Sequence, residues 1–125
     1  MRVYLAGPIF QCRDAECINW RSEVKEKLQG FEVVDPMTRD YRGITDQNYE
    51  EIINGDKKQI EQCDILLVNL IKPSVGTAME ILFAWERDKH VIVISHEKEN
   101  SPWILYHSHR IFPSLKQAIN HIKTL

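Results

Sequence analysis

Apolar positions along the chain fall into short runs that alternate with polar, amphipathic segments. The runs have the length and content of β-strands, and the segments between them carry helical spacing. The expected strands are residues 2–6, 31–34, 64–71, 90–95 and a short fifth run at 110–112. The run at 64–71 is almost continuously apolar, which is typical of a strand buried on both faces.

Helices are predicted between these strands at residues 14–29, 77–87 and 113–122. In the segment 48–62, Asn54-Gly55 is expected to end a short helical piece, so that a new helix starts near Asp56. Residues 103–109 are ambiguous. The alternation predicts an α/β fold in a single domain, residues 1–125: a doubly wound parallel sheet of four or five strands, flavodoxin- or Rossmann-like, with strand order 2-1-3-4-5.

An open parallel sheet binds ligands at the carboxyl ends of its strands, where the strand order reverses. That point lies between the first and third strands, and it gathers Tyr4, Gly7, Asp56, Ser74, Gly76 and Glu80. Two carboxylates there suit attack on an anomeric carbon and protonation of the leaving group. A helix dipole is expected to keep Glu80 ionised, and the same helix N–H groups could bind a phosphate.

Ordinary structural roles also explain these residues. Thr77 and Glu80 have the spacing of a capping box, Asp56 fits a helix N-cap, and Tyr4 fits a core strand. The tryptophans are expected to pack rather than to stack on a base: Trp20, Trp85 and Trp103. Spacing therefore gives the location of a site but not its reaction.

Composition restricts the class of partner. With 16 basic and 18 acidic residues the net charge is -2, which argues against a nucleic-acid binder. No apolar run approaches the ~18 residues of a membrane span. Three cysteines and five histidines show no metal-ligand spacing, so neither a metal nor a cofactor is expected. A reducing, cytoplasmic location is the expectation.

The segment from Asp64 to Glu80, DILLVNLIKPSVGTAME, continues through Ala84 and resembles the signature of the nucleoside 2-deoxyribosyltransferase family. This family includes the 2-deoxynucleoside 5-monophosphate N-glycosidases. The opening Val3–Pro8 is similar to the family's first strand and loop, and Trp20-Arg21 and Asp35-Pro36 also match. The resemblance extends over nearly the whole chain, in order and at matching spacing.

The resemblance implies roles for particular residues. Glu80 falls on the nucleophile that forms a covalent deoxyribosyl-enzyme intermediate. Asp56 falls on the aspartate that positions the sugar and handles the proton of the base, and Tyr4 on a tyrosine near the nucleophile. The expected substrate-binding residues are Gly7, Pro8, Ile9, Phe10, Ser74, Gly76, Arg39, Tyr106 and His107.

The resemblance leaves the substrate open. An acidic residue at the position of Ser74 goes with free nucleosides, and a serine goes with 5-monophosphates. The loop after the first strand is richer in glycine, serine and arginine in the monophosphate glycosidases, whereas residues 8–13 contain a single arginine, Arg13. Arg39 and Arg42 could supply the missing charge or could be solvated.

Transfer of the sugar to another base is the leading expectation. The alternatives are hydrolysis of deoxyribo- or ribonucleoside 5-monophosphates and a nucleotide-binding sensor module without catalysis. The resemblance also implies a homodimer or larger assembly in which a neighbouring subunit completes the site. The stretch from Asn100 to His109, with Ser101, Tyr106 and His107, is expected to reach across.

Overall fold

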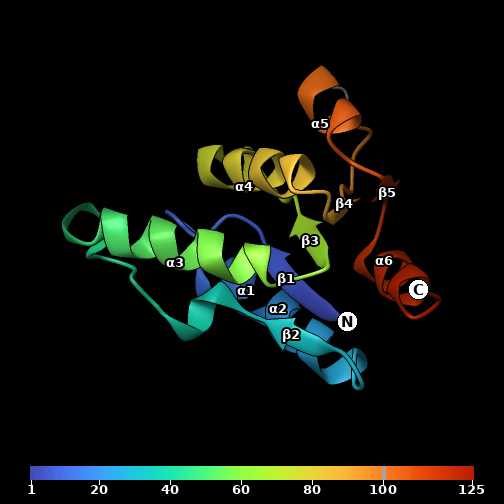
Figure 1. Cartoon of the computed structure of the whole chain (residues 1–125), viewed down its shortest axis with the longest axis horizontal. Helices are drawn as coiled ribbons and strands as arrows, with labels where there is room; N and C mark the ends of the chain where they lie inside the picture. Colours follow the sequence, from blue (N-terminus) through green and yellow to red (C-terminus); the bar gives the residue numbers. More distant parts are fainter. Residues whose placement is uncertain (100) are drawn as a thin grey trace.

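Five parallel strands form the centre of the computed structural model, which describes residues 1–99 and 101–125 (Figure 1). Their order is β2-β1-β3-β4-β5, so the expected doubly wound sheet is confirmed. The strands are β1 (Arg2–Ala6), β2 (Glu32–Val34), β3 (Ile65–Asn69), β4 (His90–Ile94) and β5 (Arg110–Phe112). Asn100, at the start of the expected partner-facing stretch, lies outside the described residues.

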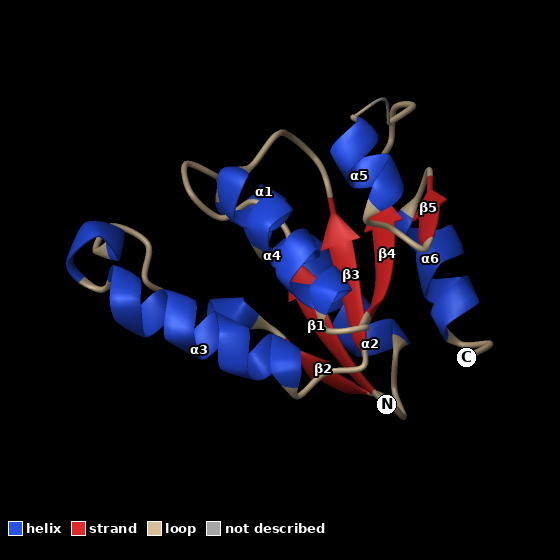
Figure 2. Ribbon diagram, turned by 45° about the horizontal axis from the view of Figure 1, so that its top comes forward, coloured by secondary structure: helices blue, strands red, loops and turns tan. Residues whose placement is uncertain are grey.

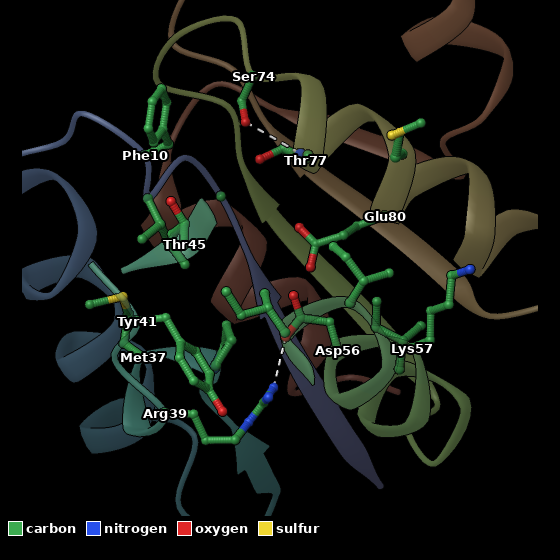
Figure 3. Close-up of a pocket in the computed structure, with 18 of the residues that line it drawn as sticks. Phe10, Met37, Arg39, Tyr41, Thr45, Asp56, Lys57, Ser74, Thr77 and Glu80 are labelled. Carbon is green, nitrogen blue, oxygen red and sulfur yellow. Dashed lines mark hydrogen bonds and ion pairs between the residues drawn. The ribbon is translucent and has the colours of Figure 1, made fainter. Parts of the chain in front are cut away.

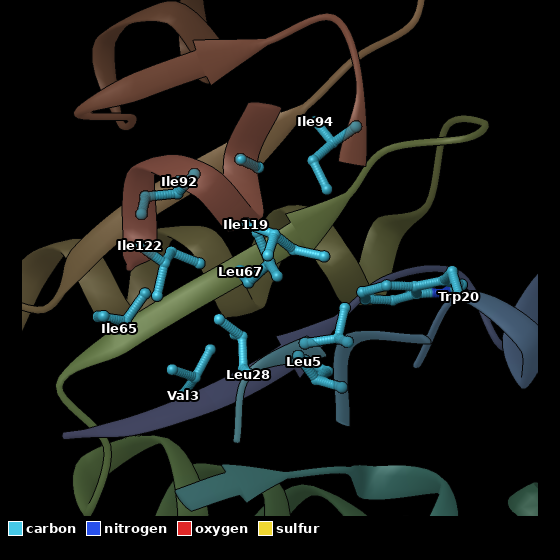
Figure 4. Close-up of a cluster of buried hydrophobic side chains, with 12 residues drawn as sticks. Val3, Leu5, Trp20, Leu28, Ile65, Leu67, Ile92, Ile94, Ile119 and Ile122 are labelled. Atoms are coloured by element: carbon cyan, nitrogen blue, oxygen red, sulfur yellow. The ribbon is translucent and has the colours of Figure 1, made fainter. Parts of the chain in front are cut away.

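Alternation along the strands builds two cores, one on each face of the sheet. On one face, strand residues such as Val3, Leu5 and Leu67 pack against α2 (Asn19–Lys27) and α6 (Leu115–Ile122), as Figure 4 shows. The residues that alternate with them along each strand pack on the opposite face, under α3 (Tyr49–Glu61), α4 (Val75–Glu86) and α5 (Pro102–Tyr106). Tyr4 belongs to this second face, which places its side chain beneath the two helices that carry the expected carboxylates.

α3 is continuous, so the break expected at Asn54-Gly55 is wrong. A glycine inside a helix costs about 1 kcal/mol relative to alanine. Burial of Ile60 against the sheet contributes more than that, roughly 1.5–3 kcal/mol. Asp56 is therefore a mid-helix residue and not an N-cap.

α4 begins at Val75, two residues before the expected start. The Oγ of Ser74 accepts the N–H of Thr77 at 3.3 Å and caps the helix, so the capping box expected at Thr77 and Glu80 is wrong. Glu80 is consequently the sixth residue of the helix, beyond the first turn where the free N–H groups lie.

Three further segments differ from the expected boundaries. The predicted helix 14–29 is divided into α1 (Asp14–Cys17) and α2, because Ile18 ends the first and begins the second. Of the ambiguous residues 103–109, those up to Tyr106 belong to α5. The expected loop 37–47 contains two short 3-10 turns, Pro36–Thr38 and Thr45–Gln47.

The two ends of the chain lie on the edge of the sheet where the strands begin (Figure 2). β1 starts there, and α6 runs back toward it from the end of β5. None of the helices described for this chain has the length and apolar character that a membrane crossing requires.

Candidate active site

A cleft of about 1160 Å³ opens at the carboxyl ends of β1 and β3, where the strand order reverses. The loop after β1 forms one wall, and α3 and α4 form others. The long loop before α3 closes the remaining side (Figure 3). This is the position at which an open parallel sheet is expected to bind a ligand. The residues expected to carry chemistry that line the cleft are Tyr4, Gly7, Ile9, Phe10, Arg39, Asp56, Ser74, Gly76 and Glu80.

Glu80 is held by a tyrosine from the sheet. The Tyr4 side chain is fully buried, and its hydroxyl donates a hydrogen bond to Oε2 of Glu80 at 2.9 Å. Parallel pairing of β1 with β3 fixes the height of Tyr4 under α4. Because a buried tyrosine hydroxyl needs a partner, this bond fixes the orientation of the Glu80 carboxyl group.

Asp56 reaches the same cleft from the middle of α3. One of its oxygens, Oδ1, accepts a hydrogen bond from Nη2 of Arg39 at 2.7 Å. The same nitrogen donates to Oε1 of Gln59 at 2.8 Å. The Asp56 and Glu80 carboxyl groups point toward one another across the cleft (Figure 3). Arg39, expected to meet the substrate, lines the cleft and also binds two side chains of α3.

Burial and like charge govern protonation here. Burial and, next in size, the negative charge of Asp56 raise the pKa of Glu80 to about 8. The Tyr4 hydrogen bond and the Arg21 charge act in the opposite direction. The expectation that a helix dipole keeps Glu80 ionised is therefore wrong, because Glu80 lies beyond the first turn of α4.

The pKa of Asp56 is raised by burial, and Arg39 opposes that rise. Burial also raises the pKa of Tyr4, with Glu80 adding to the effect, so that its hydroxyl stays protonated and remains a donor. The two carboxyl groups interact strongly and titrate as a pair. Two carboxyl groups in different surroundings, one beside the Arg39 cation and one beside the neutral Tyr4 hydroxyl, are typical of a site for general acid and nucleophilic chemistry.

The N-terminus of α4 forms the cleft wall opposite Phe10 (Figure 3). Ser74 and Gly76 both line the cleft, and the Ser74 hydroxyl is already occupied as the helix cap. The neighbouring Thr77 is 1% exposed, and its Oγ1 has no hydrogen-bond partner within the described part of the chain. Thr77 is one of the polar residues after the third strand that the sequence offers as candidates, and it lines the cleft with Ser74 and Gly76.

The loop after β1 approaches the cleft closely. A Cβ added to Gly7 would lie 3.0 Å from Cζ2 of Trp20 and 3.1 Å from the Asn69 carbonyl oxygen, so a larger residue would crowd both neighbours. Nη2 of the fully buried Arg21 donates to the Gly7 carbonyl at 3.2 Å. Trp20 and Arg21 therefore fix the path of this loop, and Pro8 is the one member of it, among those expected at the site, that does not line the cleft.

The long loop contributes side chains that the sequence did not single out. Met37, Tyr41 and Thr45 line the cleft (Figure 3). The length of a loop without strong structure was the available signal, but it does not say which side chains turn inward.

Tyr106 and His107 lie at the C-terminal end of α5 and do not line the cleft of their own chain. His107 instead borders a small groove between α4 and α5, beside the exposed Trp103. Trp20 packs in the core as expected, whereas Trp103 is 70% exposed. No group of three or more metal-ligating side chains that could hold an ion occurs in residues 1–99 and 101–125.

The known proteins that this chain resembles point to one family. A curated protein of Thermofilum pendens that carries the name 2'-deoxynucleoside 5'-phosphate N-hydrolase 1 is 30% identical over 105 residues, covering 76% of this chain and 68% of the relative.

Three solved structures share the fold. A 2-deoxyribosyltransferase from Bacillus psychrosaccharolyticus superposes with a TM-score of 0.78 at 19% identity, covering 100% of this chain and 92% of that one. The CMP N-glycosidase BcmB of Clostridium botulinum superposes with a TM-score of 0.62 at 21% identity, covering 98% of this chain and 99% of that one. A conserved protein from Enterococcus faecalis superposes with a TM-score of 0.75 at 18% identity, covering 98% of this chain and 97% of that one.

A sequence profile for nucleoside 2-deoxyribosyltransferases matches residues 3–116, which include both carboxylates, Tyr4 and the whole cleft. The chain belongs to the nucleoside 2-deoxyribosyltransferase family, whose members are deoxyribosyltransferases and N-glycosidases.

Proposed function

We propose that this enzyme cleaves the N-glycosidic bond of a 2-deoxyribonucleoside through a covalent intermediate on Glu80. The observation that supports this is the arrangement of the cleft: Glu80 is oriented by Tyr4, and Asp56 points toward it from the facing helix (Figure 3). One carboxyl group serves as nucleophile and the other as the proton donor and acceptor.

The first half of the reaction proceeds from the form of the coupled pair in which Glu80 is ionised and Asp56 carries the proton. An oxygen of Glu80 attacks the anomeric carbon, and the bond from that carbon to the base nitrogen breaks. The electron pair of the bond moves to the base, which takes the proton of Asp56. The products are a glycosyl ester on Glu80 and a free base.

The second half reverses these roles. A second base attacks the anomeric carbon, the ester bond to Glu80 breaks, and Asp56 takes back the proton that the incoming base releases. Water in place of the second base gives hydrolysis. We take transfer between bases as the activity with free nucleosides, since the sequence profile that matches this chain is that of the nucleoside 2-deoxyribosyltransferases.

Hydrolysis of a nucleoside 5-monophosphate is the second candidate. Ser74 stands where a carboxylate would repel a phosphate, and the free N–H groups of α4 lie beside it. The name of the Thermofilum pendens relative agrees with this substrate. Against it, the arginines of the long loop are engaged, Arg39 with Asp56 and Arg42 with Asp40 and Asp14. That pairing favours an uncharged nucleoside.

A second copy of this chain is the proposed partner. Val75 and Met79 on α4 are exposed, as are Trp103 and Tyr106 on α5. This apolar surface borders the cleft, because Met79 lines both the cleft and the groove beside α5. Association through it would bring Tyr106 and His107 of one copy toward the cleft of the other.

A substrate panel tests the proposal. The protein is incubated with a deoxynucleoside, its 5-monophosphate or a ribonucleoside monophosphate, with and without a second free base, and the products are separated by chromatography. A new nucleoside or nucleotide shows transfer. A free base with a free sugar, or with a sugar phosphate from a monophosphate, shows hydrolysis. Tight nucleotide binding without product over hours, or full cleavage by Glu80→Ala, would contradict the proposal; the former outcome would support a sensor module.

A further inference from the structure

Arg39 contacts α3 at a point where the helix lacks a side chain. A Cβ added to Gly55 would lie 3.1 Å from Cζ of Arg39 and in steric conflict with its Nη1. The guanidinium group therefore occupies the space that any larger residue at position 55 would fill. From there, Nη2 reaches Asp56 and Gln59.

The position of Gly55 is unfavourable for helix stability. Glycine costs about 1 kcal/mol relative to alanine in a helix interior. Gly55 has neither a positive φ nor a place in a turn that would require glycine. The close approach of Arg39 is the one feature of its surroundings that excludes a Cβ.

We propose that Arg39 and Gly55 form a positioning unit for the reaction: Gly55 leaves room for the guanidinium group, which binds one oxygen of Asp56 and directs the other toward Glu80 and the substrate. The inference rests on the proposed function, since it assigns a task to Asp56. It concerns positioning, because Arg39 acts through Asp56 and not on the substrate.

The contact between Arg39 and Asp56 affects the proton transfer that we assign to Asp56. Asp56 is partly buried and lies near Glu80, and both features favour its protonated form, so without a cation beside it the carboxyl group would hold its proton more tightly and serve less well as an acid. Arg39 offsets burial and brings Asp56 toward the range in which it can both give and accept a proton. Its ion pair is partly screened by the loop, with 27% and 21% of the two side chains exposed.

Four groups from four elements face the Asp56 carboxyl group. Arg39 comes from the long loop, Arg21 from α2, Tyr4 from β1 and Glu80 from α4. Arg21 is held by Asp35 and by backbone carbonyls, so Arg39 is the cation in direct contact with Asp56. Removing its charge favours the protonated forms of the carboxyl pair, and both pKa values of the pair rise.

The test compares the pH dependence of kcat/KM for nucleoside cleavage in the full-length chain. In Arg39→Gln we expect a loss of about tenfold to a hundredfold. The bell-shaped profile is expected to move by about one unit or more to higher pH. Arg39→Lys keeps the charge and should hold the profile near its original position with part of the rate. Arg2→Gln, which breaks an exposed pair with Glu32 at the opposite edge of the sheet, is the matched control.

Gly55→Ala separates positioning from folding. Alanine should leave the melting temperature unchanged or raise it, yet displace Arg39 and reproduce the profile of Arg39→Gln. In the double variant with Arg39→Gln, the added alanine should cost nothing further, because the space it fills is already free.

A wild-type profile in Arg39→Gln overturns the proposal, as does a double variant whose loss is the product of the two single losses. If Glu80→Ala keeps full activity, the proposed function fails as well. If Glu80→Ala is inactive while Arg39→Gln behaves as the parent does, only the positioning unit is refuted.

Discussion

Glu80 combines two demands that oppose each other. It has to ionise to attack a sugar, but burial and the charge of Asp56 favour its protonated form and raise its pKa to about 8. Stability and reactivity are therefore in conflict at this residue, as they commonly are in active sites. Tyr4 donates to Oε2 of Glu80, and this oxygen can accept the hydrogen bond whether or not the other carboxyl oxygen carries a proton.

Glu80→Gln should remove activity and stabilise the fold at alkaline pH. In the parent, folding raises the pKa of Glu80. The stability that Glu80 contributes is therefore present in full below about pH 4.5 and is lost as the pH rises through about 8. Glutamine stays neutral throughout and keeps an acceptor for Tyr4. Thermal melts at pH 5 and pH 8.5 should show a gain over the parent that grows with pH.

The control for this prediction is Glu26→Gln, an exposed glutamate on α2. It should change neither the activity nor the pH dependence of the melting temperature. Cleavage by Glu80→Gln should fall by about a thousandfold or more. Equal melting curves for parent and Glu80→Gln at pH 8.5 would contradict the raised pKa.

At the scale of elements, the N-terminus of α4 carries a structural cap that is also part of the cleft wall. Ser74 and Ser114 cap α4 and α6 with the same geometry, each accepting an N–H three residues on at 3.3 Å. Only Ser74 lines the cleft. The two serines therefore separate the contribution of a cap from the contribution of a substrate contact.

Ser74→Ala and Ser114→Ala should each cost about 1 kcal/mol of unfolding free energy, measured by urea denaturation. Only Ser74→Ala should alter kcat/KM. Ser74→Asp keeps a capping oxygen but adds a charge, so it should lower the ratio of monophosphate to nucleoside cleavage. An unchanged ratio would mean that the 5-end of the substrate does not reach α4.

Three imidazoles are stacked at the start of β4, where His90 lies next to two histidines from later parts of the chain. His90 lies 4.8 Å from His109 and 6.1 Å from His121, measured between ring centroids. Burial is the main cause that lowers the pKa of His90, with its two histidine neighbours and Arg110 adding to it. When folding lowers the pKa of a histidine, the folded protein becomes less stable as the pH falls through about 6.5.

His90→Gln should make the fold less sensitive to acid. Unfolding free energies measured in urea at pH 7.5 and pH 5.5 should differ less in this variant than in the parent. His96→Gln, in the loop after β4, is the matched control and should keep the parental difference. An equal difference in His90→Gln would show that the stack does not govern acid stability.

The elements themselves were largely predictable, and their ends were not. The apolar runs of β1 and β3 follow from the sequence. Both strands are buried along nearly their whole length, because each has to fill both cores. The uninterrupted α3 could not be foreseen, since it depends on tertiary packing that overrides Gly55. Asp56 was assigned to the cleft by an N-cap argument that is wrong, and it reaches the cleft from mid-helix instead.

Over the whole molecule, the strand order located the cleft correctly but could not say how the loops fill it. Arg39 and Asp56 lie 17 residues apart, and no spacing rule predicts their pairing. Tyr4 and Glu80 lie 76 residues apart, and their contact follows from the pairing of β1 with β3. Long-range contacts set by sheet topology were therefore accessible, whereas those set by an irregular loop were not.

Mixing two inactive variants tests whether a second copy completes the site. Glu80→Gln and His107→Ala should each be weak or inactive alone. In a symmetric dimer with shared sites, equal mixing restores one intact site in each mixed dimer, or about a quarter of the parental rate. Mixing Glu80→Gln with Asp56→Asn, both from the same chain's cleft, should restore nothing.

The placement of the chain ends has a practical consequence for handling this enzyme. Both ends lie on the edge of the sheet where the strands begin, whereas the cleft lies at the carboxyl ends of β1 and β3 (Figure 2). A tether to a solid support or a fused carrier domain at either end would thus leave the cleft facing outward. Immobilised preparations should retain access to nucleosides without any redesign of the loops around the cleft.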